Sequence, residues 1–291
     1  MAAPLPICYL NGEYQPLHQA RISPLDRGFL FADSVYEVLP VVAGRMYRFR
    51  EHFDRLERSL REVRIRSPHT HAEWLALLQE LIARNGAEDM YVYVQVTRGM
   101  EFGRNHTFPV PEAKPTVFAM ASPLPALTDD VRENGIVAIT VEDFRWGRCD
   151  IKATGLLANV LMKQQAADAG AQEAIIVHQG EILEGSSTSI FLVTGDAVST
   201  PPNSHRILPG TTRDAAVELM SNLLPVEIRR LGVEELRHVD EVWIAAATRD
   251  VIPVTQIDGR PIGNGKPGPR WQKVYRAFVE SRQALAGTPA L

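Results

Sequence analysis

The stretch GRCDIKATGLL, residues 147–157, places one lysine, Lys152, just before a turn of small residues. Lysine is rare in this chain, since only 5 of the 31 basic residues are lysine and the other 26 are arginine. A lysine amine can form a Schiff base with a carbonyl compound when burial or nearby cations lower its pKa. Arg145 and Arg148 precede Lys152 and could have that effect. The alternative is a surface lysine at the start of a helix, so the choice depends on the rest of the chain.

The first 120 residues mix strands and helices. The segment ICYLNGEY, residues 7–14, has the Asn-Gly pair that is typical of a β-hairpin. Phe53, Leu56 and Leu60 share one face of a helix expected within residues 45–65. The other elements expected here are a helix over residues 71–86 and strands over residues 90–99 and 114–122.

A proline-rich segment, SPLPALTDD at residues 122–130, interrupts these patterns. We interpret residues 121–130 as a linker between a small α+β domain, residues 1–120, and a larger α+β domain, residues 131–291. In the second part we expect strands over 135–143 and 240–248, a strand meander over 173–195, and helices over 155–170, 211–224 and 270–285. Because strands and helices do not alternate regularly, the fold class expected is α+β.

Composition excludes several classes of function. The net charge of -4 argues against nucleic acid or an anionic membrane as the main partner. No apolar run approaches the roughly 20 residues of a membrane helix, and we see no secretory signal. The two cysteines, Cys8 and Cys149, suit a reducing compartment, so we expect a cytoplasmic protein.

Glu184 is the second candidate for chemistry. It ends an expected strand in GEILEGSSTSIF, residues 180–191, and a turn with exposed hydroxyls, including Ser186, follows it. Pyridoxal phosphate, the commonest partner of a Schiff-base lysine, needs a carboxylate that faces its ring nitrogen and donors for its phosphate. The alternative is an ordinary hairpin glutamate.

LPGTTRDAAVEL, residues 208–219, places Thr211 and Thr212 at the start of an expected helix, where unpaired N–H groups favour an anion. Simple helix capping is the alternative. Arg55, in the helix expected within residues 45–65, could grip a phosphate with two nitrogens, or could be a solvated surface arginine.

A third cluster lies in RGMEFGRNHTFP, residues 98–109, directly after an expected strand. Arg104 and His106 stand in a loop rich in turn-forming residues. Such a loop could clamp a substrate carboxylate, with the arginine supplying charge and the histidine a second donor. The alternative is a polar surface loop without a binding role.

Together these stretches resemble the class IV (fold type IV) pyridoxal-phosphate aminotransferases, and most closely the D-amino acid transaminase branch. The resemblance runs from the hairpin at residues 7–14 to IPVTQIDGRPI at residues 252–262. Its motifs include DRGFLFADSVYEV (26–38), EHFDRL (51–56), VEDFRWGRCDIK (141–152), EGSSTSIF (184–191) and LPGTTRD (208–214). Their density and order make the resemblance specific.

The resemblance implies a role for each candidate. Lys152 would hold pyridoxal phosphate as a Schiff base and move the proton during catalysis, and Glu184 would face the pyridine nitrogen. The phosphate would be bound by Arg55, Ser186, Thr211, Thr212, Ala247 and Thr248, with Leu208 packed under the ring. Tyr36, Arg104 and His106 would hold the substrate carboxylate, and no metal would be needed.

The resemblance also implies a two-domain fold with the cofactor between the domains, and a homodimer in which the Arg104/His106 loop reaches the neighbouring subunit's site. Four positions depart from the family. Ser189 replaces a usual asparagine, Ala246 and Ala247 replace hydroxyl residues, and Arg249 adds a charge. These departures bear on cofactor affinity and substrate range.

The expected function is ping-pong transfer of an amino group from a D-amino acid, such as D-alanine, to a 2-oxo acid such as 2-oxoglutarate or pyruvate. Alternatives with the same fold are a branched-chain aminotransferase, an (R)-amine transaminase and an aminodeoxychorismate lyase, in which we would not expect the Arg104/His106 loop. A catalytically inactive relative with a binding or structural role is a further alternative, but it would be expected to lack Lys152 or Glu184.

Overall fold

The structure is a computed structural model that describes residues 3–286. Its contacts divide the chain into two units. The first unit runs to Pro125 and includes the short segment Ile151–Gly155. The second unit consists of Ala126–Asp150 and Leu156–Gln283. Lys152 therefore belongs by its contacts to the first unit, although we expected it in the larger C-terminal domain. The boundaries at residues 121–130 stay a prediction.

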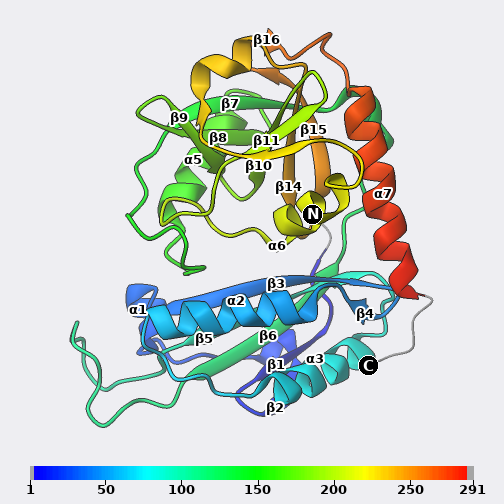
Figure 1. The fold of residues 1–291 in the computed structure, drawn as a ribbon. Helices are drawn as coiled ribbons and strands as arrows, with labels where there is room; N and C mark the ends of the chain where they lie inside the picture. Colours follow the sequence, from blue (N-terminus) through cyan, green and yellow to red (C-terminus); the bar gives the residue numbers. More distant parts are fainter. Residues whose placement is uncertain (1–2, 287–291) are drawn as a thin grey trace. The chain divides into compact units, whose positions relative to one another are not determined.

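A six-stranded antiparallel sheet organises the first unit, in the order β2-β1-β6-β5-β3-β4 (Figure 1). Its strands are β1 (Ile7–Leu10), β2 (Glu13–Pro16), β3 (Ser34–Val42), β4 (Arg45–Met46), β5 (Met90–Thr97) and β6 (Thr116–Pro123). Its helices are η1 (Leu17–Gln19), α1 (Arg27–Phe31), α2 (Phe49–Glu62) and α3 (His71–Asn85).

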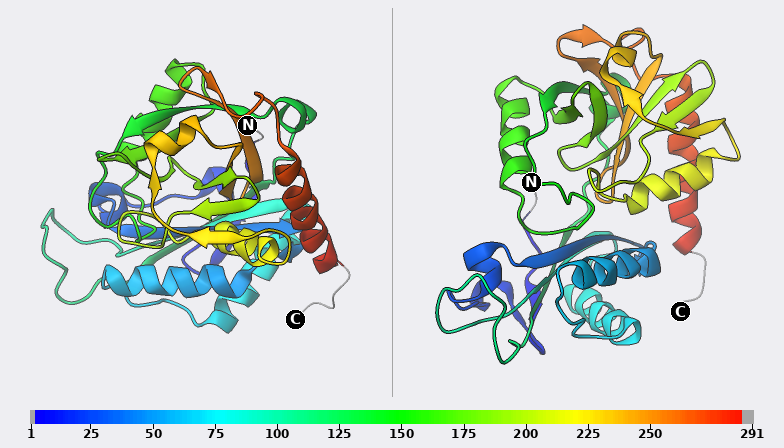
Figure 2. Two further views of the ribbon diagram at one scale, coloured as in Figure 1. Left: turned by 45° about the horizontal axis from the view of Figure 1, so that its top comes forward. Right: turned by 60° about the vertical axis from the view of Figure 1, so that its left-hand side comes forward.

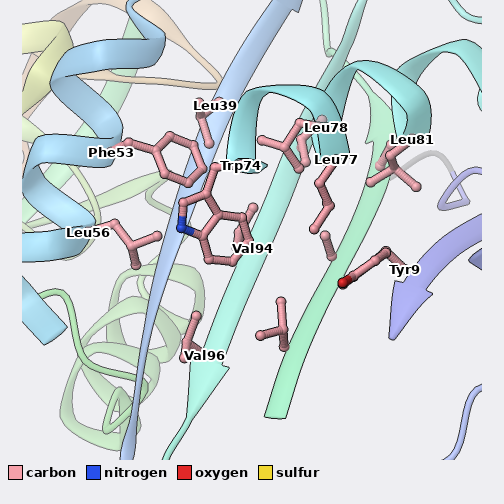
Figure 3. Packing of buried hydrophobic residues seen from close by; sticks show 14 of the residues in the cluster. Tyr9, Leu39, Phe53, Leu56, Trp74, Leu77, Leu78, Leu81, Val94 and Val96 are labelled. Atoms are coloured by element: carbon pink, nitrogen blue, oxygen red, sulfur yellow. The ribbon is translucent and has the colours of Figure 1, made fainter. Parts of the chain in front are cut away.

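The two faces of this sheet differ because side chains alternate along each strand. Along β5, Met90, Val92, Val94 and Val96 are fully buried, whereas the intervening side chains are half-buried. The buried face packs against α2 and α3, where Trp74 lies among Phe53, Leu56 and Leu39 (Figure 3). The opposite face carries Tyr36 of β3 and Tyr91, Tyr93 and Gln95 of β5, and it carries part of the candidate site.

A second, mixed sheet organises the second unit, in the order β12-β11-β10-β14-β15-β7-β8-β9-β13, with β16 paired to β15. Its strands are β7 (Ile136–Glu142), β8 (Glu173–His178), β9 (Glu181–Gly185), β10 (Ser189–Thr194), β11 (Ala197–Thr200), β12 (Val226–Ile228), β13 (Leu231–Gly232), β14 (Glu241–Ala246), β15 (Asp250–Ile257) and β16 (Arg260–Pro261). Its helices are α4 (Asp129–Asn134), α5 (Leu157–Asp168), α6 (Thr211–Met220), η2 (Val233–Arg237) and α7 (Pro269–Ala286).

Helix α5 packs against β7 and β8, which run parallel to each other (Figures 1 and 2). Met162 and Ala166 on α5 are fully buried against Ala174 and Ile176 of β8. On the exposed face of α5 the apolar side chains of Leu157, Val160 and Leu161 remain accessible. None of the described helices combines the length and apolar character needed to cross a bilayer.

The expected secondary structure is largely confirmed. The hairpin turns at Asn11 and Gly12, which both have positive φ, and α3 ends at Gly86 in the left-handed conformation. Within the predicted linker, β6 continues to Pro123 and α4 begins at Asp129, so only residues 124–128 lie outside both elements. Pairing of β6 with Met90 and Tyr91 of β5 keeps residues 122 and 123 in the sheet.

Candidate active site

Lys152 lies in an extended segment that is bound to the start of β3, not at the start of a helix. The Tyr36 N–H donates to the Lys152 carbonyl at 2.9 Å, and the Lys152 N–H donates to Ser59 Oγ of α2 at 3.3 Å. The neighbouring Thr154 hydroxyl hydrogen-bonds to Ser34. Since the backbone is held on both sides of Lys152, the position of its side chain is set by β3 and α2.

The Lys152 side chain extends over an aromatic pair. Its Nζ lies 4.2 Å from the centroid of the Tyr36 ring, which in turn stacks on Tyr93 with centroids 5.6 Å apart. Burial, with a smaller effect of Tyr36, raises the pKa of Tyr93 to about 12, so this phenol stays neutral near neutral pH. The structure thus brings Lys152 and Tyr36, two of the predicted site residues, into contact.

Arg55 is buried and paired, so the alternative of a solvated arginine was wrong. Its Nε and Nη2 donate to the two Glu37 oxygens at 2.7 and 2.8 Å. His52 Nδ1 lies 2.9 Å from the same carboxylate. Burial alone would raise the pKa of Glu37, but Arg55 and His52 hold it well below its usual range. Binding of a phosphate by Arg55 stays a prediction, and it would have to use the part of the guanidinium that faces away from Glu37.

Glu184 is buried near the end of β9 and held by two donors. Arg145 Nη1 donates to Oε1 at 2.5 Å, and the Leu208 N–H donates to Oε2 at 3.1 Å. Arg145 also binds Asp143 at 3.0 Å, and these hydrogen bonds outweigh burial and lower the pKa of Asp143. These bonds fix the Glu184 carboxylate in one orientation near the end of β9.

Apart from Arg55, which belongs to the first unit, the groups predicted to bind phosphate lie at one end of two central strands of the larger sheet. Ser189 at the start of β10 pairs with Ala245 near the end of β14, so the Gly185–Thr188 turn and the turn after Ala246 lie at the same end of these strands. The start of α6 reaches this end as well, because a Cβ on Gly210 would lie 2.5 Å from Ser189 Oγ. Ser186, Thr211, Thr212, Ala247 and Thr248 therefore belong to one region, which Leu208 links to Glu184.

A buried carboxylate supports the turn that carries Ser186. Ser186 Oγ donates to Glu173 at 2.5 Å, and Glu173 is fully buried on β8. Asn159 of α5 donates to the Ser186 carbonyl at 2.8 Å. Lys163, also on α5, lies 3.3 Å from Glu173 and balances its charge. The turn is therefore held from two elements.

Arg104 and His106 lie in the exposed loop between β5 and β6, which extends away from the sheet (Figure 1). Both contact Phe31 of α1. The Arg104 guanidinium carbon lies 4.9 Å from the ring centroid, and the His106 ring centroid lies 5.2 Å away. Two of the three predicted carboxylate ligands thus contact one aromatic ring, and the third, Tyr36, contacts Lys152 instead.

Three structural partners of the candidate residues had not been singled out from the sequence. Glu37 pairs with Arg55, Glu173 holds Ser186, and Phe31 contacts the loop. The only signal for Glu37 in the sequence was its charge, because the alternation of side chains along β3 assigns its position to the core. Glu173 and Phe31 meet their partners through tertiary contacts that local patterns do not reveal.

Residues 34–257 match the model of the family described as amino-transferase class IV. This match spans more than half of the chain and includes Lys152, Glu184 and α6. The chain belongs to the class IV aminotransferases.

Within this family, the chain is similar to proteins named D-alanine aminotransferase. It is 38% identical over 281 residues to the one from Staphylococcus haemolyticus, covering 95% of this chain and 99% of the relative. It is 37% identical over 275 residues to the one from Bacillus licheniformis, covering 93% and 95%.

Solved structures of branched-chain amino acid aminotransferases share the fold. One from T.th., determined with pyridoxamine 5′-phosphate, has a TM-score of 0.89 at 26% identity and covers 96% of this chain and 95% of that one. One from Escherichia coli has a TM-score of 0.88 at 26% identity and covers 95% and 94%. The expected α+β, fold type IV class is therefore confirmed.

Proposed function

We propose that this protein is a pyridoxal-phosphate-dependent D-amino acid transaminase, which moves an amino group from a D-amino acid such as D-alanine to a 2-oxo acid such as 2-oxoglutarate or pyruvate. The observation that carries the proposal is the similarity along nearly the whole chain to D-alanine aminotransferases. The contact of both Arg104 and His106 with Phe31 supports it, because a cationic and an imidazole donor in the same loop suit a carboxylate.

The residues present suit pyridoxal phosphate. In our proposal Lys152 forms the Schiff base, and Glu184 faces the pyridine nitrogen. Hydroxyls of Thr211, Thr212 and Thr248, backbone N–H groups near Ala247 and the Arg55 guanidinium bind the phosphate, while Leu208 packs under the ring. Ser186, predicted from the sequence to contact the cofactor, donates its only hydroxyl hydrogen to Glu173 and so holds the turn instead of donating to the phosphate. The first-turn N–H groups of α6 support this assignment, because Gly210 caps the helix without a side-chain cap that would compete for them.

When bound, the cofactor supplies an electron sink for the electron pair left by breaking the substrate Cα–H bond. The chain's own groups supply the proton transfers. Once the substrate amino group has replaced it on the cofactor, the free Lys152 amine would take up the proton from the substrate Cα and hold it for return. Glu184, held by Arg145, would keep the ring nitrogen protonated. Tyr36, Arg104 and His106 would orient the substrate by its carboxylate, so that the Cα–H bond is presented to Lys152.

A branched-chain aminotransferase is the second candidate, because the solved structures reported above carry that name. The exposed Arg104/His106 loop favours a D-amino acid transaminase over a branched-chain aminotransferase. We also infer that the protein is a cytoplasmic homodimer in which this loop approaches the partner's site. Phe102 and Val110 of the loop are 86% and 95% exposed, so this loop offers two apolar side chains that a second copy could cover. Buried free Cys8 and Cys149 suit a reducing compartment.

An assay of product formation tests the proposed function. The purified holoenzyme is given 2-oxoglutarate together with D-alanine, L-alanine or L-leucine, and pyruvate, D-glutamate and L-glutamate are measured. We expect pyruvate and D-glutamate from D-alanine alone. Formation of L-glutamate from L-leucine would assign the protein to the branched-chain group instead.

A further inference from the structure

The aromatic ring of Phe31 contacts two of the three proposed carboxylate ligands, Arg104 and His106. Phe31 is the last residue of α1, is half-buried, and contacts the Arg104 guanidinium and the His106 ring. Arg104 and His106 are themselves exposed. An arginine stacked over an aromatic ring loses part of its freedom before any ligand arrives.

Arg27, at the start of the same helix, holds the loop backbone over this ring. Its Nη1 donates to the Asn105 carbonyl at 2.6 Å and to Glu101 at 3.0 Å, and its Nη2 donates to the His106 carbonyl at 3.4 Å. The Arg27 side chain is almost fully buried, and its guanidinium carbon lies 4.9 Å from the Phe31 centroid. The backbone around Arg104 and His106 is thereby tied to α1.

Helix α1 is in turn attached to both ends of the loop. The Asp26 carboxylate caps the helix through the Gly28 N–H at 2.8 Å. The same carboxylate accepts from Thr97, the last residue of β5, at 3.0 Å and from Thr116, the first residue of β6, at 2.7 Å. A Cβ on Gly28 would lie 2.5 Å from the Thr97 side chain, so glycine permits this close approach. α1 is therefore a firm support for the loop.

We propose that Phe31 is a positioning residue for the substrate carboxylate. Its ring holds Arg104 and His106 in the arrangement that a carboxylate requires, while Arg27 holds the loop backbone beside the ring through the Asn105 and His106 carbonyls. Phe31 acts through these two side chains and does not contact the reacting atoms. The inference rests on the proposed function, since it assumes that Arg104 and His106 bind substrate. Because the Arg104 and His106 side chains are already ordered by Phe31, less conformational entropy is lost when the substrate carboxylate binds.

The test compares Phe31→Leu, Phe31→Tyr and Phe29→Leu. Phe29 lies in the same short helix but is 76% exposed, so Phe29→Leu is a matched control. We expect Phe31→Leu to raise the KM for D-alanine and for 2-oxoglutarate by roughly tenfold, within the range expected for a lost cation–π contact, with kcat changed less than about twofold. Phe31→Tyr retains an aromatic ring and should restore KM, and Phe29→Leu should leave it unchanged.

A double variant and two physical measurements separate positioning from folding. In the Arg104→Ala background, Phe31→Leu should raise KM by a smaller factor than in the wild type. The melting temperature and the visible cofactor band should stay close to wild type. Equal factors in both backgrounds, or a lower melting temperature with unchanged KM, would contradict the proposal. If the wild-type enzyme does not use D-alanine, the proposed function itself fails, and that result is seen before any variant is compared.

Discussion

Two arginines in the first unit, Arg55 and Arg104, differ in burial, and the difference indicates different roles. Arg55 is buried and donates to both oxygens of Glu37, so much of its hydrogen-bonding capacity is already used within the chain. Arg104 is exposed, and its described contact is with the face of an aromatic ring. A guanidinium held over a ring keeps its N–H groups available for a carboxylate, which suits Arg104 to substrate binding.

The first prediction concerns Arg104. Replacing it with alanine should raise the KM for D-alanine by about 10- to 100-fold, the range expected when a hydrogen bond to a charged group is lost. The visible cofactor band should be unchanged, because the residues proposed to bind the cofactor are elsewhere in the chain. Arg61→Ala is the control, since the Arg61 side chain is 70% exposed on α2. Steady-state kinetics with both variants provide the comparison, and an unchanged KM in Arg104→Ala would remove the proposed role.

Individual candidates could be found from the sequence where residue type was informative by itself. Lys152 was conspicuous because lysine is rare, and Glu184 because a hydroxyl-rich turn follows it. The partners of these residues could not be found in the same way. Arg145 meets Glu184 across 39 positions of the chain, and the Lys152 N–H meets Ser59 across 93. Such contacts depend on tertiary packing, which local patterns do not encode.

At the scale of secondary-structure elements, the start of α6 is the most constrained part of the proposed cofactor site. Gly210 approaches Ser189 so closely that a methyl group would displace one of them. The first turn of α6 would then move relative to the turns that carry Ser186 and Thr248 at the end of the strands. The position of this helix start is therefore expected to matter for phosphate binding more than any single hydroxyl.

The second prediction follows from this close approach. Gly210→Ala should weaken pyridoxal phosphate binding by at least about tenfold, measured by titrating the apoenzyme with the cofactor, because the N–H groups of α6 shift. Gly147→Ala is a matched control, since a Cβ there meets nothing within 4 Å. Adding Ser189→Ala should restore part of the affinity by removing the clashing oxygen. Unchanged affinity in Gly210→Ala would show that the start of α6 does not bind the phosphate.

The third prediction concerns the link between α2 and β3. Burial is the main cause that lowers the pKa of His52 from 6.5, with smaller contributions from Arg55 and Lys152, and Glu37 opposes the shift. Folded His52 therefore binds fewer protons than unfolded His52, so stability is lost as the pH falls below 6.5. The lowered pKa of Glu37 acts in the same direction below 4.5.

Urea unfolding at several pH values measures this effect. Between pH 6.5 and 5.5, we expect His52 to contribute to a loss in the free energy of unfolding, because its folded-state pKa is lowered. His52→Gln should make the pH dependence shallower in this interval, while His18→Gln, at an exposed position, should not. If the free energy of unfolding depends on pH equally in His52→Gln and in the wild type, His52 is excluded as the source of the pH dependence.

At the scale of the whole molecule, the order of motifs along the chain was a better guide than any one element. The α+β class and the family could be predicted, because the motifs occur in the right sequence over nearly the whole chain. The grouping of Ile151–Gly155 with the first unit could not be predicted, since it depends on pairing with β3 at Val35. The six-residue helix α4 was missed because it is too short for a clear helical period.

The fourth prediction concerns assembly. If the apolar residues of the Arg104/His106 loop contact a second copy, the protein should have about twice the 32.3 kDa mass of one chain in light scattering coupled to size-exclusion chromatography. Phe102→Ser should then shift the equilibrium toward single chains and lower activity in proportion, whereas Phe29→Leu should do neither. A wild-type protein that is monomeric and fully active at micromolar concentration would contradict the proposed homodimer.

The most direct test of the central claim is the visible absorption spectrum of the purified protein, recorded before and after addition of D-alanine without an acceptor. L-leucine in a parallel sample and the Lys152→Ala variant serve as controls. A D-amino acid transaminase that uses Lys152 should show a visible cofactor band that D-alanine bleaches and L-leucine does not, and the variant should lack that band. Bleaching by L-leucine alone would contradict the proposed substrate class, and an unaltered band in the variant would contradict the role of Lys152.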